Sequence, residues 1–266
     1  MPRDLGDVLH FFLPTSGDGA GATGEEAEGP PGEARRPAAL PILALPVRDR
    51  DVVRAAFAWN LAVEIARLGG TASLLAPVEP ETSALWPEPG RGPVGSEVIL
   101  THVDDLAGLT RAALDVAVNR AADSSDGGVV LVRVPPEWLR DPREGRAALR
   151  WTLLFATPDA RDLRGAYALA KPLLLANPTA RVGITIHGAR RIEDATQAWE
   201  RVAGAASRHL GRSLVSYGLL VDDLHVYRAI VARRPIGLEH PQSPAARALR
   251  DVARLVLEDA RKIALA

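Results

Sequence analysis

The chain has 266 residues, 47% of them hydrophobic, and a formal net charge of −1 at pH 7. This length and composition predict one large α/β domain, and the near-neutral charge does not favour nucleic acid or an anionic membrane as a bulk partner. The sequence contains no cysteine, which excludes disulfides, thiolate metal sites and a cysteine nucleophile, and is typical of a cytoplasmic protein. We expect no secretory signal, since acidic residues lie near the N-terminus, and no spanning helix.

The N-terminal residues divide into two segments ahead of the globular domain. Residues 1–14 form a short apolar segment, and residues 15–38 are rich in Gly, Pro, Ala and Glu, which predicts a disordered linker. The α/β domain is expected over 39–266. A short apolar segment on a tether is a common way to dock a partner protein, with Leu9, Phe11 and Phe12 as the candidate contacts. The alternative is that this segment covers an apolar patch on its own domain.

From residue 40 onward, apolar runs alternate with helical periods. Strands are expected over 40–46, 72–76, 97–102, 128–134, 150–156, 181–187 and 214–220. Helices are expected over 51–69, 105–123, 160–176, 191–210, 222–232 and 243–262. This alternation predicts a doubly wound, mostly parallel sheet with helices on both faces, in which ligands bind beyond the carboxyl ends of the strands.

The loop after the first strand is unusual for a domain that opens with strand, loop and helix. Its sequence, PVRDRDVVRAA, contains no glycine and no lysine, whereas a phosphate-binding loop needs glycines for close backbone approach and a lysine for the phosphates. The two lysines of the chain, Lys171 and Lys262, do not follow a glycine. A GK[ST] triplet is therefore absent from the sequence.

Charged residues at the strand ends leave several alternatives open. Arg48, Arg50, Arg54 and Arg133 form either a remodelled anion pocket or a set of solvated loop arginines. His187, Asp159 and Asp162 could act as acid or base, but carboxylates also favour helix N-termini for structural reasons alone. The scattered histidines and the absence of a GxSxG motif disfavour a metal site and serine hydrolysis, so we expect no catalytic residue and no metal.

Three segments resemble the MinD/ParA class of P-loop ATPases, and most closely its FlhG subgroup of flagellar regulators. They are NLAVEIARLGG at 60–70, TPDARDLRGAYALAK at 157–171 and the run SYGLLVDDLHVYRAIVARRPIGLEHPQSPAARALRDVARLV at 216–256. The resemblance covers about residues 40–258. It implies a P-loop NTPase fold of the MinD type and, in members with intact motifs, ATP and magnesium as ligands.

The resemblance also implies that the nucleotide motifs of this chain are degenerate. Arg54 matches the Walker lysine, Ala55 the magnesium-binding threonine and Asp49 the additional lysine of the family. The glycine positions hold Arg48, Arg50, Asp51 and Val53. The acidic motif after the second strand is replaced by Ala76 and Val78, the Walker B aspartate by Arg133, and the adenine-reading asparagine by His187. These substitutions predict that ATP and magnesium do not bind.

The sequence thus predicts a protein that is not an enzyme, a pseudo-ATPase that regulates or scaffolds by binding protein partners. Flagellar or polar placement is implied by the resemblance. Candidate partner contacts besides the N-terminal segment are Trp138, Asp162 and Tyr167. The last helix is expected to pack in the core, without a stable membrane anchor, and the oligomeric state stays open. The alternatives are an ATPase with an unorthodox loop and an anion sensor that uses the arginines.

Overall fold

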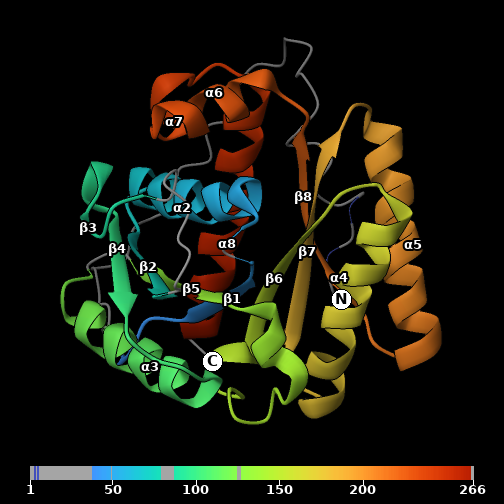
Figure 1. The fold of residues 1–266 in the computed structure, drawn as a ribbon, viewed down its shortest axis with the longest axis horizontal. Helices are drawn as coiled ribbons and strands as arrows, with labels where there is room; N and C mark the ends of the chain where they lie inside the picture. Colours follow the sequence, from blue (N-terminus) through green and yellow to red (C-terminus); the bar gives the residue numbers. More distant parts are fainter. Residues whose placement is uncertain are drawn as a thin grey trace, which may run out of the picture.

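The computed structural model describes residues 3, 5, 38–48, 50–78, 87–124 and 127–264. Within them, eight strands form one sheet in the order β3-β4-β2-β5-β1-β6-β7-β8 (Figure 1). The strands are β1 (Ile42–Pro46), β2 (Thr71–Pro77), β3 (Gly90–Arg91), β4 (Glu97–Thr101), β5 (Gly128–Val134), β6 (Trp151–Ala156), β7 (Arg181–Ala189) and β8 (Val215–Val221). Neighbouring strands are parallel except β3 and β4, which are antiparallel.

Helices cover both faces of the sheet (Figure 1). They are α2 (Val52–Arg67), α3 (Leu106–Ala122), α4 (Ala160–Ala176), α5 (Ile192–Leu210), α6 (Leu224–Ala232), α7 (Ile236–Glu239) and α8 (Pro244–Ala264), with 3-10 turns η1 (Pro93–Gly95), η2 (Pro136–Arg140) and η3 (Ala148–Arg150). The connection through α2 leads from β1 toward the β3 edge of the sheet. The connections through α3, α4 and α5 lead toward the β8 edge. Since such crossovers are right-handed, α2 lies on the face opposite α3, α4 and α5.

The predicted doubly wound parallel sheet is confirmed. The helix over 160–176 and the strand over 128–134 have the predicted bounds, and the other predicted elements differ by at most two residues at each end. The sequence did not reveal β3, α7 or the 3-10 turns. A two-residue strand and a single helical turn are too short for either periodicity to be visible.

Aspartates begin four of the helices that follow strand ends, among them α6, where Asp223 accepts a hydrogen bond from the N–H of His225 at 2.9 Å. Asp51 accepts a hydrogen bond from the N–H of Arg54 at 3.1 Å, Asp105 from Gly108 at 2.7 Å, and Asp159 from Arg161 at 2.8 Å. Each caps backbone N–H groups that have no partner inside the helix. The chain therefore turns into α2, α3, α4 and α6 at defined residues beyond the sheet.

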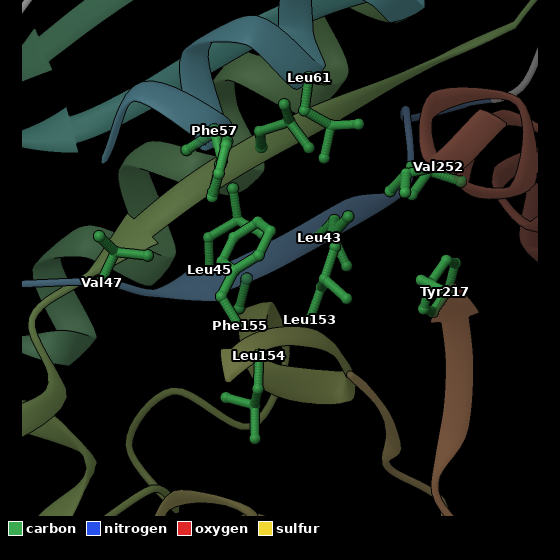
Figure 2. Packing of buried hydrophobic residues seen from close by; sticks show 14 of the residues in the cluster. Leu43, Leu45, Val47, Phe57, Leu61, Leu153, Leu154, Phe155, Tyr217 and Val252 are labelled. Atoms are coloured by element: carbon green, nitrogen blue, oxygen red, sulfur yellow. The ribbon is translucent and has the colours of Figure 1, made fainter. Parts of the chain in front are cut away.

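The core lies between the sheet and its helices. Leu43, Ala44 and Leu45 of β1 have no exposed surface, as expected for a central parallel strand covered on both faces. Phe57 of α2 packs against Phe155 of β6, with ring centroids 5.9 Å apart, close to Leu45 (Figure 2). The start of α2 is thus fixed to the centre of the sheet by apolar packing.

The C-terminal helix α8 packs in the core, as predicted. Its buried face includes Leu249, Val252 and Val256, and it contacts α2. Buried Glu64 of α2 is 2.7 Å from Arg67 and 3.4 Å from Arg250 of α8, so an ionic contact also joins the two helices. Across the described ranges, every helix is too short or too polar to cross a bilayer.

Of the N-terminal segment, the described residues are Arg3 and Leu5, and both contact the α/β domain. The carbonyl of Arg3 accepts a hydrogen bond from the N–H of Ser216 in β8 at 2.9 Å, and Leu5 is 1% exposed. These two residues therefore fold back onto their own domain. The candidate contacts Leu9, Phe11 and Phe12 lie outside the described residues.

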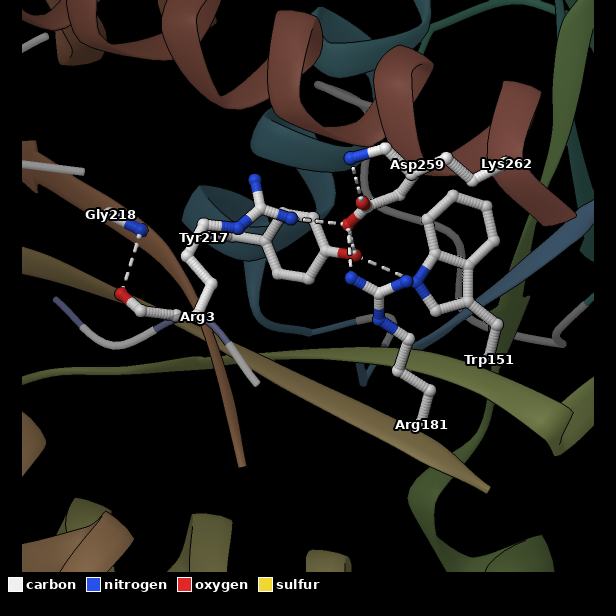
Figure 3. Close-up of polar contacts among 8 residues, drawn as sticks. Arg3, Trp151, Arg181, Tyr217, Gly218, Asp259 and Lys262 are labelled. Carbon is white, nitrogen blue, oxygen red and sulfur yellow. Dashed lines mark hydrogen bonds and ion pairs between the residues drawn. The ribbon is translucent and has the colours of Figure 1, made fainter. Parts of the chain in front are cut away.

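A buried polar network joins the sheet to α8. The indole N–H of Trp151 donates to the hydroxyl of Tyr217 at 2.9 Å, and that hydroxyl donates to Asp259 at 2.7 Å (Figure 3). Burial, and then the nearby charge of Asp259, raises the pKa of Tyr217, so the hydroxyl stays protonated and can make both bonds.

Replacing Tyr217 with phenylalanine removes both hydrogen bonds of this network. The indole N–H of Trp151 would be left buried without its acceptor, so Tyr217→Phe should lower the free energy of unfolding by about 1–3 kcal/mol. Urea denaturation followed by circular dichroism measures this. Tyr227→Phe is the matched control, because Tyr227 is 48% exposed, and should change stability by less than about 0.5 kcal/mol. Equal effects of the two changes would contradict the role given to the network.

Candidate functional site

A cavity of about 520 Å³ lies beyond the carboxyl ends of β1 and β6. It is bounded by the β1–α2 loop on one side and by the first turns of α4 on the other. Its lining residues are Pro46, Val47, Arg48, Asp51, Arg54, Pro136, Leu154, Phe155, Asp159, Arg161, Asp162, Gly165, Ala166, Ala168 and Leu169. This is the edge of the sheet where doubly wound folds bind ligands.

The β1–α2 loop is held in place by backbone contacts. Val47 is buried, and its N–H donates to the carbonyl of Val134 at 3.2 Å, which extends the pairing of β1 with β5 beyond Pro46. The N–H of Asp51 donates to the carbonyl of Arg48 at 3.1 Å, which closes a turn. The Asp51 carboxylate then caps α2, so that Arg54 lies in the first turn of the helix.

Arg54 is the central cation of the site. Its Nη2 lies 2.5 Å from Oδ2 of Asp162 in α4, and its Nη1 lies 3.2 Å from Oδ2 of Asp51. Its Nε donates to Nε2 of His187 in β7 at 3.1 Å. One guanidinium therefore joins three elements of the chain: the start of α2, the start of α4 and the end of β7.

Asp162 is held in its ionised form by two donors. Besides the bond from Arg54, its Oδ2 accepts the backbone N–H of Thr157 at 2.6 Å. Burial alone would raise the pKa of Asp162, but the hydrogen bonds from Arg54 and Thr157 outweigh burial, and the pKa lies below its ordinary value of 3.8. The Asp162 carboxylate, a predicted partner contact, is thus engaged inside the protein.

His187 is neutral in this site. Its side chain is largely buried, its ring meets Phe57 edge-on with centroids 5.3 Å apart, and its Nε2 accepts from Arg54. Burial, followed by the charge of Arg54, lowers the pKa of His187 to about 4, with Asp162 opposing the shift. A neutral imidazole that accepts from a guanidinium serves to orient Arg54 at neutral pH.

Two further arginines line this cavity, in which three arginines and three aspartates balance in formal charge. Arg48 and Arg161 are exposed, and in the described part of the chain neither guanidinium has an ion pair or a hydrogen bond. Of the three lining aspartates, Asp51 and Asp162 contact Arg54, and Asp159 accepts N–H groups of α4. The cavity can therefore bind an anion through Arg48 and Arg161.

The other residues at the predicted nucleotide positions lie elsewhere. Arg133 has no exposed surface, and its Nη2 donates to the carbonyl of Pro77 in β2 at 3.4 Å, away from the cavity lining. Arg50 is exposed and does not line the cavity. Neither of the two alternatives for the four arginines therefore holds for the whole set, since two of the four line the cavity and Arg133 is buried. Ala55 and Ala76 are buried, Val53 is half-buried, Val78 is 38% exposed, and Asp49 lies outside the described residues.

The structure also places the remaining predicted partner contacts. Trp138 and Tyr167 are half-buried and pack against the core. Sequence reasoning did not single out Arg161, although it is the second residue of a helix that follows a strand end, a position from which a side chain can reach the site. The described residues hold no group of three or more His, Asp or Glu side chains arranged to hold a metal ion.

Solved structures share this architecture at low sequence identity. MinD in the MinC:MinD cell division complex of Aquifex aeolicus aligns with a TM-score of 0.58 and 13% identity, over 82% of this chain and 96% of that chain. MinD of Pyrococcus horikoshii complexed with Mg-ADP aligns with 0.57 and 13%, over 81% and 95%. A ParA family ATPase of Chlorobium tepidum aligns with 0.50 and 14%, over 81% and 98%.

The chain has the MinD/ParA P-loop NTPase fold. No protein-family model and no curated protein match the sequence, so the likeness is one of fold. At 13–14% identity it does not by itself transfer an activity.

Two expectations from the sequence are wrong in the light of these structures. The motif changes led us to expect that the chain is not an enzyme and takes neither ATP nor magnesium. Structures with the same MinD/ParA fold include a cell division ATPase and a ParA family ATPase, and one was solved with Mg-ADP. The residue types at the motif positions alone therefore do not exclude nucleotide binding or hydrolysis on this fold.

The side chains present fit the anionic part of a nucleotide better than they fit a metal ion. Arg48 and Arg161 offer two guanidinium groups that have no partner among the described residues, on a cavity with apolar walls at Leu154 and Leu169. In the described lining, carboxylates contact Arg54 or a helix N-terminus. A phosphate or carboxylate group would therefore be bound by arginine directly.

Acid should weaken the domain through His187. Its folded pKa of about 4 lies below the ordinary value of 6.5, so the unfolded state takes up the proton first and stability falls as the pH drops from about 6.5 to about 4. The pKa of Asp162 lies below its ordinary value of 3.8, so the stability that the ionised Asp162 contributes is lost only below about pH 4. Urea denaturation at pH 7 and pH 4.5 should show a loss of about 2 kcal/mol that His187→Gln reduces.

The matched control for this titration is His209→Gln, because His209 is exposed near the end of α5. It should leave the difference between pH 7 and pH 4.5 unchanged. A wild-type difference that survives His187→Gln in full would show that another group is responsible.

Proposed function

We propose that this chain is a MinD/ParA-like regulator that binds a protein partner and responds to an anionic ligand in the cavity at Arg48 and Arg161. The observation that carries the proposal is that two guanidinium groups of the cavity lining have no partner among the described residues. The carboxylates of that lining are already engaged by Arg54 and by helix N-terminal N–H groups, whereas Arg48 and Arg161 are not engaged by described residues. Nucleotides are the first ligands to test, since MinD with this fold was solved with Mg-ADP.

A protein partner is supported by the fold and by the position of the cavity. The MinD chain that aligns with this one was solved in complex with MinC. The cavity lies between the β1–α2 loop and α4, so a bound anion would contact both and would bias their relative position. A ligand that favours one arrangement of a binding surface shifts the population of that arrangement.

The finer assignment to the FlhG subgroup, with a role in flagellar or polar placement, rests on the resemblance of the segment at 216–256 to that subgroup. Under this proposal, residues 1–14 are a partner-docking segment, 15–38 a linker and 39–266 the regulatory domain. Trp138, Asp162 and Tyr167 would support a partner surface through the positions of η2 and α4. Measuring binding of a purified candidate partner with and without the anion tests this part.

A MinD/ParA-type ATPase with an unorthodox loop is the second candidate, favoured by the same fold. Under it, Arg54 in the first turn of α2 would take the place of the Walker lysine. Phosphate release from ATP, measured with and without magnesium, separates the two functions. Hydrolysis that Arg54→Ala abolishes would favour the ATPase, and binding without hydrolysis would favour the regulator.

Ligand binding through the arginines can be measured by calorimetry and thermal shift. The ligands are ATP, ADP, inorganic phosphate and small dicarboxylates, each with and without magnesium. At least one should bind, and the Arg48→Ala/Arg161→Ala double variant should weaken its affinity at least ten-fold, because each guanidinium–anion contact contributes about 1.5–3 kcal/mol.

Arg164→Ala is the matched control for the double variant. Arg164 is an exposed arginine on the same helix, but it does not line the cavity, so its loss should leave the affinity within about two-fold. The proposal would be overturned if no ligand bound, or if the control weakened binding as much as the double variant did.

A further inference from the structure

Arg3 of the chain's own N-terminal segment contacts the outer edge of the sheet at β8. One side of β8 pairs with β7, and on the other the N–H of Ser216 donates to the carbonyl of Arg3 at 2.9 Å. An uncovered edge strand exposes backbone donors and acceptors that readily pair with another extended chain. The carbonyl of Arg3 thus pairs with a backbone N–H of β8 that would otherwise be available to an added strand.

The same edge contains a buried carboxylate. Asp259 of α8 is 1% exposed, and its Oδ2 lies 2.5 Å from Nη2 of Arg3 and 2.7 Å from Nη2 of Arg181 (Figure 3). The same oxygen accepts the Tyr217 hydroxyl at 2.7 Å. Charge-assisted hydrogen bonds to a buried carboxylate are stronger than neutral ones, so the position next to Asp259 favours a guanidinium over an uncharged side chain.

Two further contacts hold the segment that contains Arg3 against the domain. Arg3 lies over the Tyr217 ring, with its guanidinium carbon 5.2 Å from the ring centroid, and Leu5 is buried in the hydrophobic core. The segment is therefore recognised in three ways: by its backbone at Ser216, by the arginine at Asp259 and by the leucine two residues later.

We propose that the β8 edge together with Asp259 is a binding site for an extended peptide that carries arginine followed two residues later by leucine. The chain's own Arg3 and Leu5 fill this site within the same molecule. Strand addition gives such a site its affinity and the side-chain positions give its specificity. A partner with the same pattern gains access only when the N-terminus leaves, and the apolar stretch Val8–Leu13 follows this anchor directly in the sequence.

The site can be opened in the full-length chain by replacing both anchors with alanine, Arg3→Ala/Leu5→Ala. The probe is a fluorescein-labelled peptide of residues 1–10, MPRDLGDVLH, followed by fluorescence anisotropy. It should bind the opened chain at least ten-fold more tightly than the wild-type chain, whose site is filled. A peptide with alanine in place of its arginine should bind the opened chain at least ten-fold more weakly.

Two variants of the opened chain test whether Asp259 binds the arginine of the peptide. Asp259→Asn should weaken peptide binding at least ten-fold. Lys262→Ala is the matched control: its amino group lies 3.9 Å from Asp259, but the side chain is 72% exposed, and affinity should stay within two-fold. Binding that does not depend on the peptide arginine or on Asp259 would overturn the proposal.

Hydrogen exchange gives a second test that does not depend on how the Asp259 variant folds. In the full-length chain, Arg3→Ala should raise the exchange rate of the Ser216 amide at least ten-fold, while Lys262→Ala should not. Protection in the wild-type chain should be independent of protein concentration, because the segment binds within one molecule. An unchanged rate in Arg3→Ala, or protection that grows with concentration, would contradict intramolecular filling of the site.

Discussion

The ion pair between Arg54 and Asp162 is the contact on which the candidate site depends. It joins the first turn of α2 to the first turn of α4 at 2.5 Å, and both side chains are largely withdrawn from solvent. Asp51 and His187 hold the same guanidinium from two further directions. Arg54 contacts two of the three aspartates that line the cavity, and the guanidinium groups of Arg48 and Arg161 have no partner among the described residues, so these two groups are available to a ligand.

The sheet topology explains why these groups meet. The strands β1 and β6 are neighbours, but the chain leaves them toward opposite faces of the sheet, through α2 from β1 and through α4 from β6. A crevice forms where neighbouring strands part in this way, and both helix N-termini open on it. Asp51 and Asp159 accept hydrogen bonds from the backbone N–H groups at those N-termini, and both residues line the cavity.

The sheet could be predicted from the sequence because parallel strands covered on both faces are continuous apolar runs, as in GVVLVRV of β5. The site could not, because Arg54 and Asp162 are 108 residues apart and no periodicity links them. Residue type alone also misplaced Arg133, whose side chain turns toward β2 inside the protein. The missing motif residues were read as a loss of nucleotide chemistry, a conclusion that the MinD/ParA fold does not support.

The most direct measurement of this account is the coupling free energy between Arg54 and Asp162. Urea denaturation of the wild-type chain, Arg54→Ala, Asp162→Asn and the double variant closes a thermodynamic cycle. A partly buried, hydrogen-bonded ion pair that fixes the site should give a coupling of about 1.5–3 kcal/mol at neutral pH. Additive effects, with a coupling below about 0.5 kcal/mol, would show that the pair does not hold the two helices together and would contradict the account.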